Sequence, residues 1–143
     1  MLQRIQTIWL LLVAVCAFAT YSLSIYIGYL PDGSSKKFLI PDSFLLFPLV
    51  FGMGGLAIVC IFLFKKRKLQ LRLCIIGILL SIAVIIAEYF KTTDFKEINK
   101  TIFQSGSYQI GALIPFVIVI LFYLAARGIY KDEKLVKSLD RLR

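Results

Sequence analysis

Glu88 is the one acidic residue within an apolar run of this sequence, and its spacing places it on a helix face with small and polar residues. The residues Cys74, Gly77, Ser81, Val84 and Glu88 follow one another at steps of three and four, which is the spacing of one side of an α-helix. Such a stripe is expected to face the interior of a bundle. A carboxyl group held there can carry a proton or bind a cation, and an ionisable residue in a membrane span is by default a functional hypothesis.

Two interpretations of Glu88 are open at this stage. In one, the carboxyl group works with the hydroxyl groups of Ser81, Thr20 and Ser24 as the polar site of a small oligomeric transporter or channel. In the other, which we favour, Glu88 is two residues from the end of its run, so its side chain reaches headgroup water or pairs with Lys91.

The residues that most enzyme chemistry requires are missing or scattered. The sequence has no histidine, so the commonest metal ligand and general base is absent. The cysteines Cys16, Cys60 and Cys74 all lie in apolar runs, where we interpret them as small apolar side chains and not as a disulfide framework. No nucleophile, base and metal ligand converge, so we expect no catalytic, cofactor or metal site and no enzymatic activity.

The composition indicates what kind of element positions these residues. Apolar residues make up 59% of the chain and charged residues 17%, against about 45–50% and about 25% in soluble domains. A bilayer is crossed by about 20 apolar residues, and four runs of this kind occupy residues 7–27, 44–64, 71–90 and 108–126. We therefore predict an all-α membrane protein, a single domain over residues 1–143, with four transmembrane helices in an antiparallel bundle.

The first apolar run has a second interpretation. Ala17-Phe18-Ala19 has the form of a signal-peptide cleavage site, and Arg4 precedes the run. The run continues to Ile27, however, which is longer than the apolar part of a signal peptide. We favour a membrane span.

The connections between the runs carry patterns of their own. Pro31-Asp32-Gly33 is a turn signal between two short segments that favour strands, so the first connection, residues 28–43, is predicted to include a short outer β-hairpin. Residues 91–107 are the second outer connection. The tail, residues 127–143, is predicted to be an amphipathic cytoplasmic helix, and its apolar stripe consists of Leu135, Val136, Leu139 and Leu142.

The second run contains a stripe of small residues at helical spacing. Small residues let helix backbones approach closely where lipid offers no hydrophobic driving force. We expect this stripe to pack against another helix, in the same chain or in a second copy. It consists of Pro48, Gly52, Gly55 and Val59.

The charges indicate which way the chain faces. The net charge is +9, with 17 Lys and Arg against 8 Asp and Glu. Twelve of the basic residues fall in the termini and the connection between the second and third runs, and five fall in the other two connections. By the positive-inside rule both termini are cytoplasmic. Because the positive charge sorts by side of the membrane, we expect no nucleic acid partner.

The predicted cytoplasmic side contains the candidate interaction face. Its basic residues would contact anionic headgroups of the inner leaflet, and the tail would lie on lipid or dock on a membrane or cytoplasmic protein; both alternatives stay open. The candidate residues are Gln3, Arg4, Gln6, Lys65, Lys66, Arg67, Lys68, Asp132, Glu133, Lys134, Lys137, Asp140, Arg141 and Arg143.

The two ends of the chain resemble a known family. The motifs are Met1-Leu2-Gln3-Arg4-Ile5-Gln6-Thr7, leading into Ile8-Trp9-Leu10-Leu11, and Arg127-Gly128-Ile129 followed by the charged segment 131–143. They are similar to the ends of small bacterial four-span membrane proteins catalogued as domain of unknown function 4293. The resemblance implies the four-span layout and a bacterial inner membrane, and it implies no activity, substrate or catalytic residue.

Together these observations predict a multi-pass protein of the bacterial inner membrane that is not an enzyme. We expect a scaffold or accessory subunit that presents a basic cytoplasmic face and that can form a homo-oligomer. The alternative is the small oligomeric transporter or channel that uses Glu88.

Overall fold

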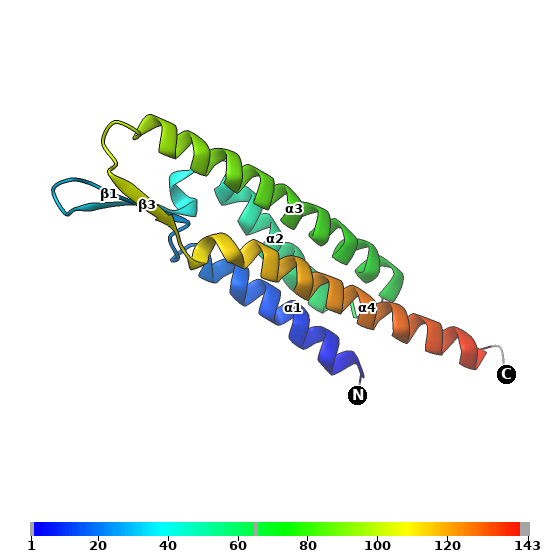
Figure 1. The fold of residues 1–143 in the computed structure, drawn as a ribbon. Coiled ribbons are helices and arrows are strands. Elements are labelled where there is room, and N and C mark those ends of the chain that lie inside the picture. Colours follow the sequence, from blue (N-terminus) through cyan, green and yellow to red (C-terminus); the bar gives the residue numbers. More distant parts are fainter. Residues whose placement is uncertain (1, 65, 141–143) are drawn as a thin grey trace.

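The chain folds into four α-helices and a small antiparallel sheet (Figure 1). A computed structural model describes residues 2–64 and 66–140. The helices are α1 (Leu2–Ala19), α2 (Leu46–Phe62), α3 (Arg67–Ile98) and α4 (Ile114–Asp140). The strands are β1 (Tyr26–Tyr29), β2 (Ser35–Phe38) and β3 (Ser105–Tyr108), and two short 3₁₀ helices are η1 (Ile40–Asp42) and η2 (Ile110–Leu113).

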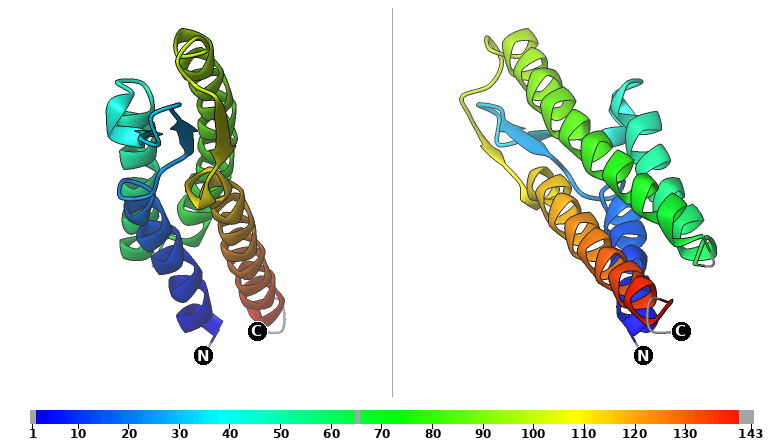
Figure 2. Two further views of the ribbon diagram at one scale, coloured as in Figure 1. Left: turned by 60° about the vertical axis from the view of Figure 1, so that its left-hand side comes forward. Right: turned by 90° about the vertical axis from the view of Figure 1, so that its right-hand side faces the viewer.

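The four helices form an antiparallel bundle in which each helix packs on two others. α1 contacts α2 and α4, and α3 contacts the same two helices from the other side. The sheet lies at one end of the bundle, which we call the sheet end (Figures 1 and 2). α1 begins and α4 finishes at the opposite end, which we call the terminal end.

The helix boundaries differ from the apolar runs at the sheet end. α1 ends at Ala19, eight residues before the run ends at Ile27, because residues 26–29 form β1. α4 begins at Ile114 and not at Tyr108, because residues 105–108 form β3. α3 continues to Ile98 and so takes up half of the predicted second connection. At the other end, α4 runs without a break into the tail as far as Asp140.

The predicted β-hairpin is present and gains a third strand. Gly33 has φ +77° in the turn between β1 and β2, a backbone conformation that favours glycine. The strand order is β2-β1-β3, with Tyr26 opposite both Phe38 and Tyr108. A two-stranded hairpin is marginal alone, and β3 together with α3 provides the support that it needs.

Phe95, in the extension of α3, joins the helix to the sheet. Its ring centroid lies 5.1 Å from that of Phe38, 6.4 Å from that of Tyr26 and 5.7 Å from that of Phe103. Aromatic pairs at these separations are stabilising beyond their buried area. These contacts stabilise the part of α3 that extends past the apolar run, because the extension places Phe95 against the aromatic rings of the sheet.

The polar stripe predicted for the third run faces the bundle interior. Cys74, Gly77, Ser81, Val84 and Glu88 are all buried. Gly77 lies against the fully buried ring of Phe122 in α4, and a Cβ atom at this position would be 2.7 Å from the Phe122 ring. The glycine therefore sets how closely α3 and α4 approach.

The stripe predicted for the second run does not pack against another helix of this chain, and its packing in a second copy stays a prediction. Nothing lies within 4 Å of a Cβ atom built on Gly52 or Gly55, and Val59 is exposed. Gly54 faces the bundle instead, where its Cβ would lie 3.3 Å from Cβ of Ala17 in α1. The pattern misled because α2 is apolar on every side, so its hydropathy does not distinguish the inner face.

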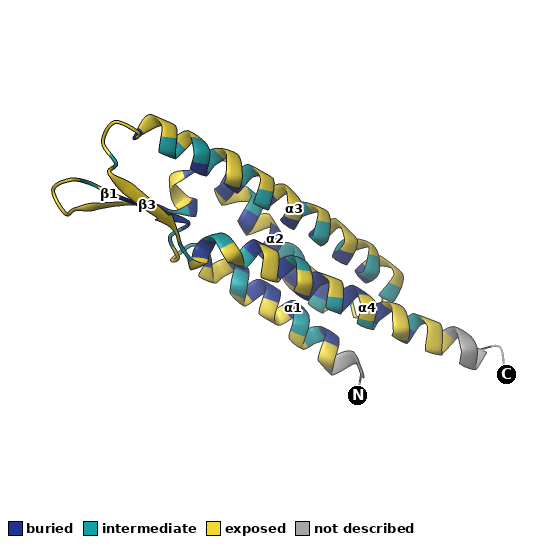
Figure 3. Cartoon of the chain, in the orientation of Figure 1, coloured by how far each residue is buried: buried dark blue, intermediate teal, exposed yellow. Residues whose placement is uncertain are grey.

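Two helical stretches among the described residues are long and apolar enough to cross a membrane. They are Arg67–Ile98 and Ile110–Val136. The apolar stretches Ile5–Ala19 and Leu46–Phe62 are shorter. Figure 3 shows that exposed residues follow the outer faces of the helices along the bundle.

The variant Gly77→Ala is expected to lower stability, and Gly52→Ala is its matched control. The new methyl group at position 77 overlaps the buried Phe122 ring, and overpacking of this kind costs about 1–3 kcal/mol. At position 52 the methyl group meets open space, and alanine favours the helix over glycine by about 1 kcal/mol. Thermal unfolding should give a lower Tm for Gly77→Ala and an unchanged or higher Tm for Gly52→Ala; equal values would contradict the close approach.

Candidate functional site

A buried hydrogen bond joins the two ends of the chain at the terminal end. Nε2 of Gln6 in α1 donates to Oδ2 of Asp132 in α4 over 2.6 Å, and the two residues are only 6% and 7% exposed. Gly128, one turn before Asp132, makes room for this contact, because a Cβ atom there would lie 2.9 Å from Cγ of Gln6. A hydrogen bond to a buried carboxylate is among the stronger ones.

Asp132 also links α4 to the start of α3. Its backbone carbonyl accepts a hydrogen bond from Nη1 of Arg67 at 3.4 Å, which is long for such a bond. Within the described part of the chain, Oδ1 of Asp132 is buried and has no hydrogen-bond partner. Gln70, one turn further along α3, donates to the carbonyl of Cys60 at 3.0 Å and so closes the α2–α3 hairpin.

A basic groove lies beside this buried contact. It has a volume of about 730 Å³ and runs between the start of α3 and the tail part of α4. Among its described lining residues four are basic, one is acidic and two are apolar, namely Lys66, Arg67, Lys68, Arg72, Glu133, Leu69 and Val136. The excess of positive charge suits an anionic group. We call this groove the basic groove.

The structure divides the predicted interaction face into buried and exposed members. Gln6 and Asp132 were expected to face a partner and are instead buried against each other. Lys66, Lys68 and Lys134 are exposed, and Arg67 and Glu133 are half-buried. Gln3, Arg4, Lys137 and Asp140 lie on α1 and α4, but their side chains are not described. Lys65, Arg141 and Arg143 lie outside the described residues.

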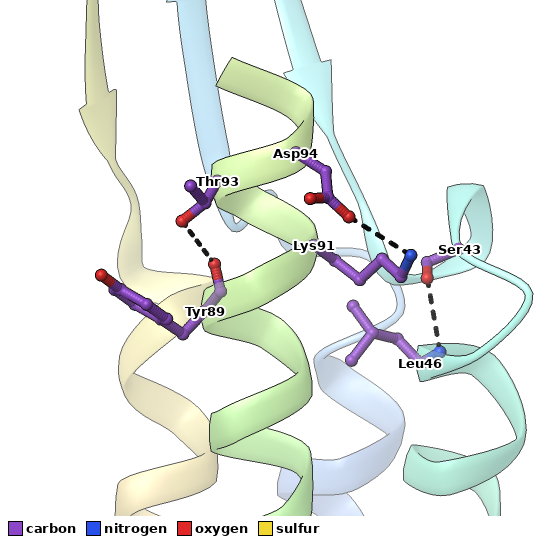
Figure 4. Close-up of polar contacts among 6 residues, drawn as sticks. All are labelled: Ser43, Leu46, Tyr89, Lys91, Thr93 and Asp94. Carbon is purple, nitrogen blue, oxygen red and sulfur yellow. Dashed lines mark hydrogen bonds and ion pairs between the residues drawn. The ribbon is translucent and has the colours of Figure 1, made fainter. Parts of the chain in front are cut away.

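Glu88 occupies a second candidate site, at the sheet end. It is only 6% exposed, and its Oε1 atom has no hydrogen-bond partner among the described residues. The predicted pairing of Glu88 with Lys91 is therefore wrong, and contact of Glu88 with headgroup water stays a prediction. Lys91 pairs with Asp94 instead, at 3.4 Å (Figure 4). The physical reason is that α3 continues for ten residues beyond Glu88, so that Lys91 and Asp94 lie on the same helix and pair with each other.

The hydroxyl groups expected to accompany Glu88 are used elsewhere. Oγ1 of Thr20 donates to the carbonyl of Cys16 at 2.7 Å, and Oγ of Ser81 donates to the carbonyl of Gly77 at 2.6 Å. Both bonds are to the residue's own helical turn, and Ser24 is half-buried in the turn that follows α1. No hydrogen bond in the described ranges joins these three residues to Glu88.

Thr92 is the polar neighbour that the sequence analysis did not name. It lies one turn after Glu88 on the same face, it is fully buried, and its Oγ1 atom lacks a hydrogen-bond partner in the part of the chain described. Steps of three and four residues from Glu88 would have reached position 92. Position 92 lies beyond Phe90, where the apolar run ends, so the run by itself does not include Thr92.

The fold and these sites define a class of helical protein with two long apolar helices. It has a basic groove at the terminal end of its bundle and a buried acidic residue, Glu88, towards the sheet end. The family described as "Domain of unknown function (DUF4293)" matches residues 2–142. The chain belongs to this family. It matches no curated protein and no solved structure.

Replacing Gln6 by alanine is expected to destabilise the fold. The substitution leaves Oδ2 of Asp132 buried without the donor that it has in the native chain, and an unsatisfied buried acceptor costs about 1–3 kcal/mol. Lys134→Ala, at an exposed position of the same helix as Asp132, is the control and should change the free energy of unfolding by less than about 0.5 kcal/mol. Equal unfolding curves for the two variants would show that the contact does not hold α1 to α4.

Proposed function

We propose that this chain is a four-span protein of the bacterial inner membrane, with both termini in the cytoplasm, that acts as a scaffold or accessory subunit and catalyses no reaction. In this proposal the terminal end is the cytoplasmic end and the sheet end faces the outside. The basic groove is the part that a partner contacts.

The exposure of the long helices supports a membrane location. Within the most apolar 18 residues of Arg67–Ile98 and of Ile110–Val136, only 28% and 39% are buried. The core helix of a soluble protein would bury most of such a segment. Outward-facing apolar side chains occur on all four helices, for example Val15 (55% exposed), Phe51 (58%), Leu79 (63%) and Ile120 (58%).

The two shorter helices are compatible with the same bilayer. α1 has 18 residues and α2 has 17, which correspond to about 27 and about 26 Å of helix. The hydrocarbon core is about 30 Å thick. A bilayer accommodates a difference of this size by local thinning, at a modest cost in free energy.

The observation that carries the scaffold proposal is the position of the basic groove beside the buried contact between Gln6 and Asp132. That contact fixes the tail part of α4 against α1, so the groove has a rigid wall. Leu69 and Val136 add apolar surface to the four basic residues. An acidic segment of a partner protein, with apolar residues among its carboxylates, matches this combination.

A second candidate function, a small oligomeric transporter or channel, is favoured by the burial of Glu88 without a hydrogen-bond partner for Oε1 among the described residues. The dispersal of Ser81, Thr20 and Ser24 weighs against a continuous polar path. Solute flux through reconstituted vesicles that depends on Glu88 would rank this candidate above the scaffold.

Reversing the charge of the basic groove is expected to remove its partners. The double variant Lys66→Glu with Lys68→Glu changes two exposed side chains of the groove. When the tagged variant is purified from solubilised membranes, the proteins that accompany the native chain should be missing. The control is Lys37→Glu with Lys100→Glu, which makes the same charge change at exposed positions of the sheet end and should keep those proteins. Identical partners in all three preparations would contradict the proposal.

A further inference from the structure

A pocket opens at the sheet end between α3 and the segment that leads into α4. Its volume is about 480 Å³. Much of its wall is aromatic or aliphatic, with Tyr89 from α3, Leu113 from η2 and Phe116 from the first turn of α4. These three side chains are themselves largely exposed. The pocket is therefore open on an apolar side. We call it the Glu88 pocket.

The polar groups of the pocket point to the chemistry of its occupant. Oε1 of Glu88 and Oγ1 of Thr92 are buried, and neither has a hydrogen-bond partner within the described residues. A carboxyl oxygen that is buried without a hydrogen-bond donor is destabilising. An occupant that supplies a donor removes this penalty, and a cationic donor forms the stronger bond.

The charges around the pocket favour a cation over an anion. Among the described lining residues none is Lys or Arg, and Glu88 is the one ionisable acid. Lys96 lies nearby, but its ammonium group is placed over the rings of Tyr108 and Tyr26, at 4.0 and 4.7 Å from their centroids. Among the described residues no ammonium group pairs with Glu88, and the contact of Lys96 with Tyr108 shows that a ring lining this pocket accepts such a group.

We propose that the Glu88 pocket binds a long-chain amine. The ammonium group donates hydrogen bonds to Oε1 of Glu88 and Oγ1 of Thr92, and the alkyl chain lies along Leu113 and Phe116. The amine is carried by a single-chain amphiphile or by the headgroup of an aminolipid, and both supply the same recognition chemistry. This inference does not depend on the scaffold role.

Electron paramagnetic resonance of spin-labelled probes in phosphatidylcholine vesicles that contain the full chain tests the proposal. The probes are octadecylamine, octadecanol and octadecanoic acid, each labelled at the same chain position, and the measured quantity is the fraction held immobile by the protein. We expect the amine to associate about tenfold more strongly than the alcohol, as one charge-assisted hydrogen bond would give. The acid should associate least.

Three variants separate the pocket from unspecific attraction to negative charge. Glu88→Gln keeps the shape of the side chain and should lower the immobile fraction of the amine probe to that of the alcohol probe. Glu97→Gln removes an exposed carboxylate from the same helix and should leave the amine preference intact. Ala112→Phe fills the pocket without changing its charge, because Ala112 lines it, and should also abolish the preference.

A further pair of probes distinguishes the two sources of the amine. Stronger association of spin-labelled phosphatidylethanolamine than of phosphatidylcholine, lost in Glu88→Gln, supports a lipid headgroup. A preference for octadecylamine without a preference for phosphatidylethanolamine supports a single-chain amine. An amine preference that survives both Glu88→Gln and Ala112→Phe overturns the proposal. Equal association of octadecylamine, octadecanol and octadecanoic acid with the native chain also overturns it. Equal association is the result expected if a second copy of the chain fills the pocket.

Discussion

The helices leave much of their apolar surface on the outside of the bundle, and the need to cover that surface governs the rest of the structure. In water, exposed apolar area costs about 25 cal/mol per Å², and side chains such as Leu79 and Ile120 contribute to it along the length of α3 and α4. In the proposed bilayer this penalty disappears. The hydrophobic drive between the helices disappears with it, so the bundle must be held by close packing and by polar contacts.

The contacts inside the bundle fit that requirement. Gly77 lets the Phe122 ring reach the backbone of α3, which increases van der Waals contact where two long helices meet. Gln6 with Asp132 and Gln70 with the Cys60 carbonyl tie the helices together at the terminal end. At the sheet end the corresponding role falls to the aromatic cluster around Phe95. Glu88, Thr92 and Asp132 are the exceptions, because Oε1, Oγ1 and Oδ1 of these residues, respectively, are buried without a hydrogen-bond partner among the described residues.

The sequence predicted those features whose physical cause is local. The turn at Gly33 follows from a Pro-Asp-Gly sequence, and the buried stripe of α3 follows from polar and small residues at steps of three and four. Features that depend on distant partners were missed. β3 consists of Ser105-Gly106-Ser107-Tyr108, whose low strand propensity is overridden by pairing with β1, almost eighty residues earlier. The sequence did not identify Gly54 as the glycine that faces α1, because every side of α2 is apolar.

Among the candidate site residues too, the sequence predicted the features with a local cause and missed those that depend on distant partners. Charge clustering identified Lys66, Arg67 and Lys68, which do line a groove. It did not reveal that Gln6 and Asp132 bind each other, since their separation of 126 residues leaves no local signal. For Glu88 the stripe indicated the inner face, whereas the end of the apolar run two residues later favoured a pairing with Lys91. The helix continues to Ile98, and Lys91 pairs with Asp94.

The solubility of the protein tests the central claim most directly. Bacterial cells that produce the full chain should be broken and their membranes washed with alkaline carbonate, which removes peripheral proteins. Our account predicts that the chain stays in the membrane pellet and enters solution only with detergent. Recovery of a monodisperse monomer from the soluble fraction in buffer alone would contradict it.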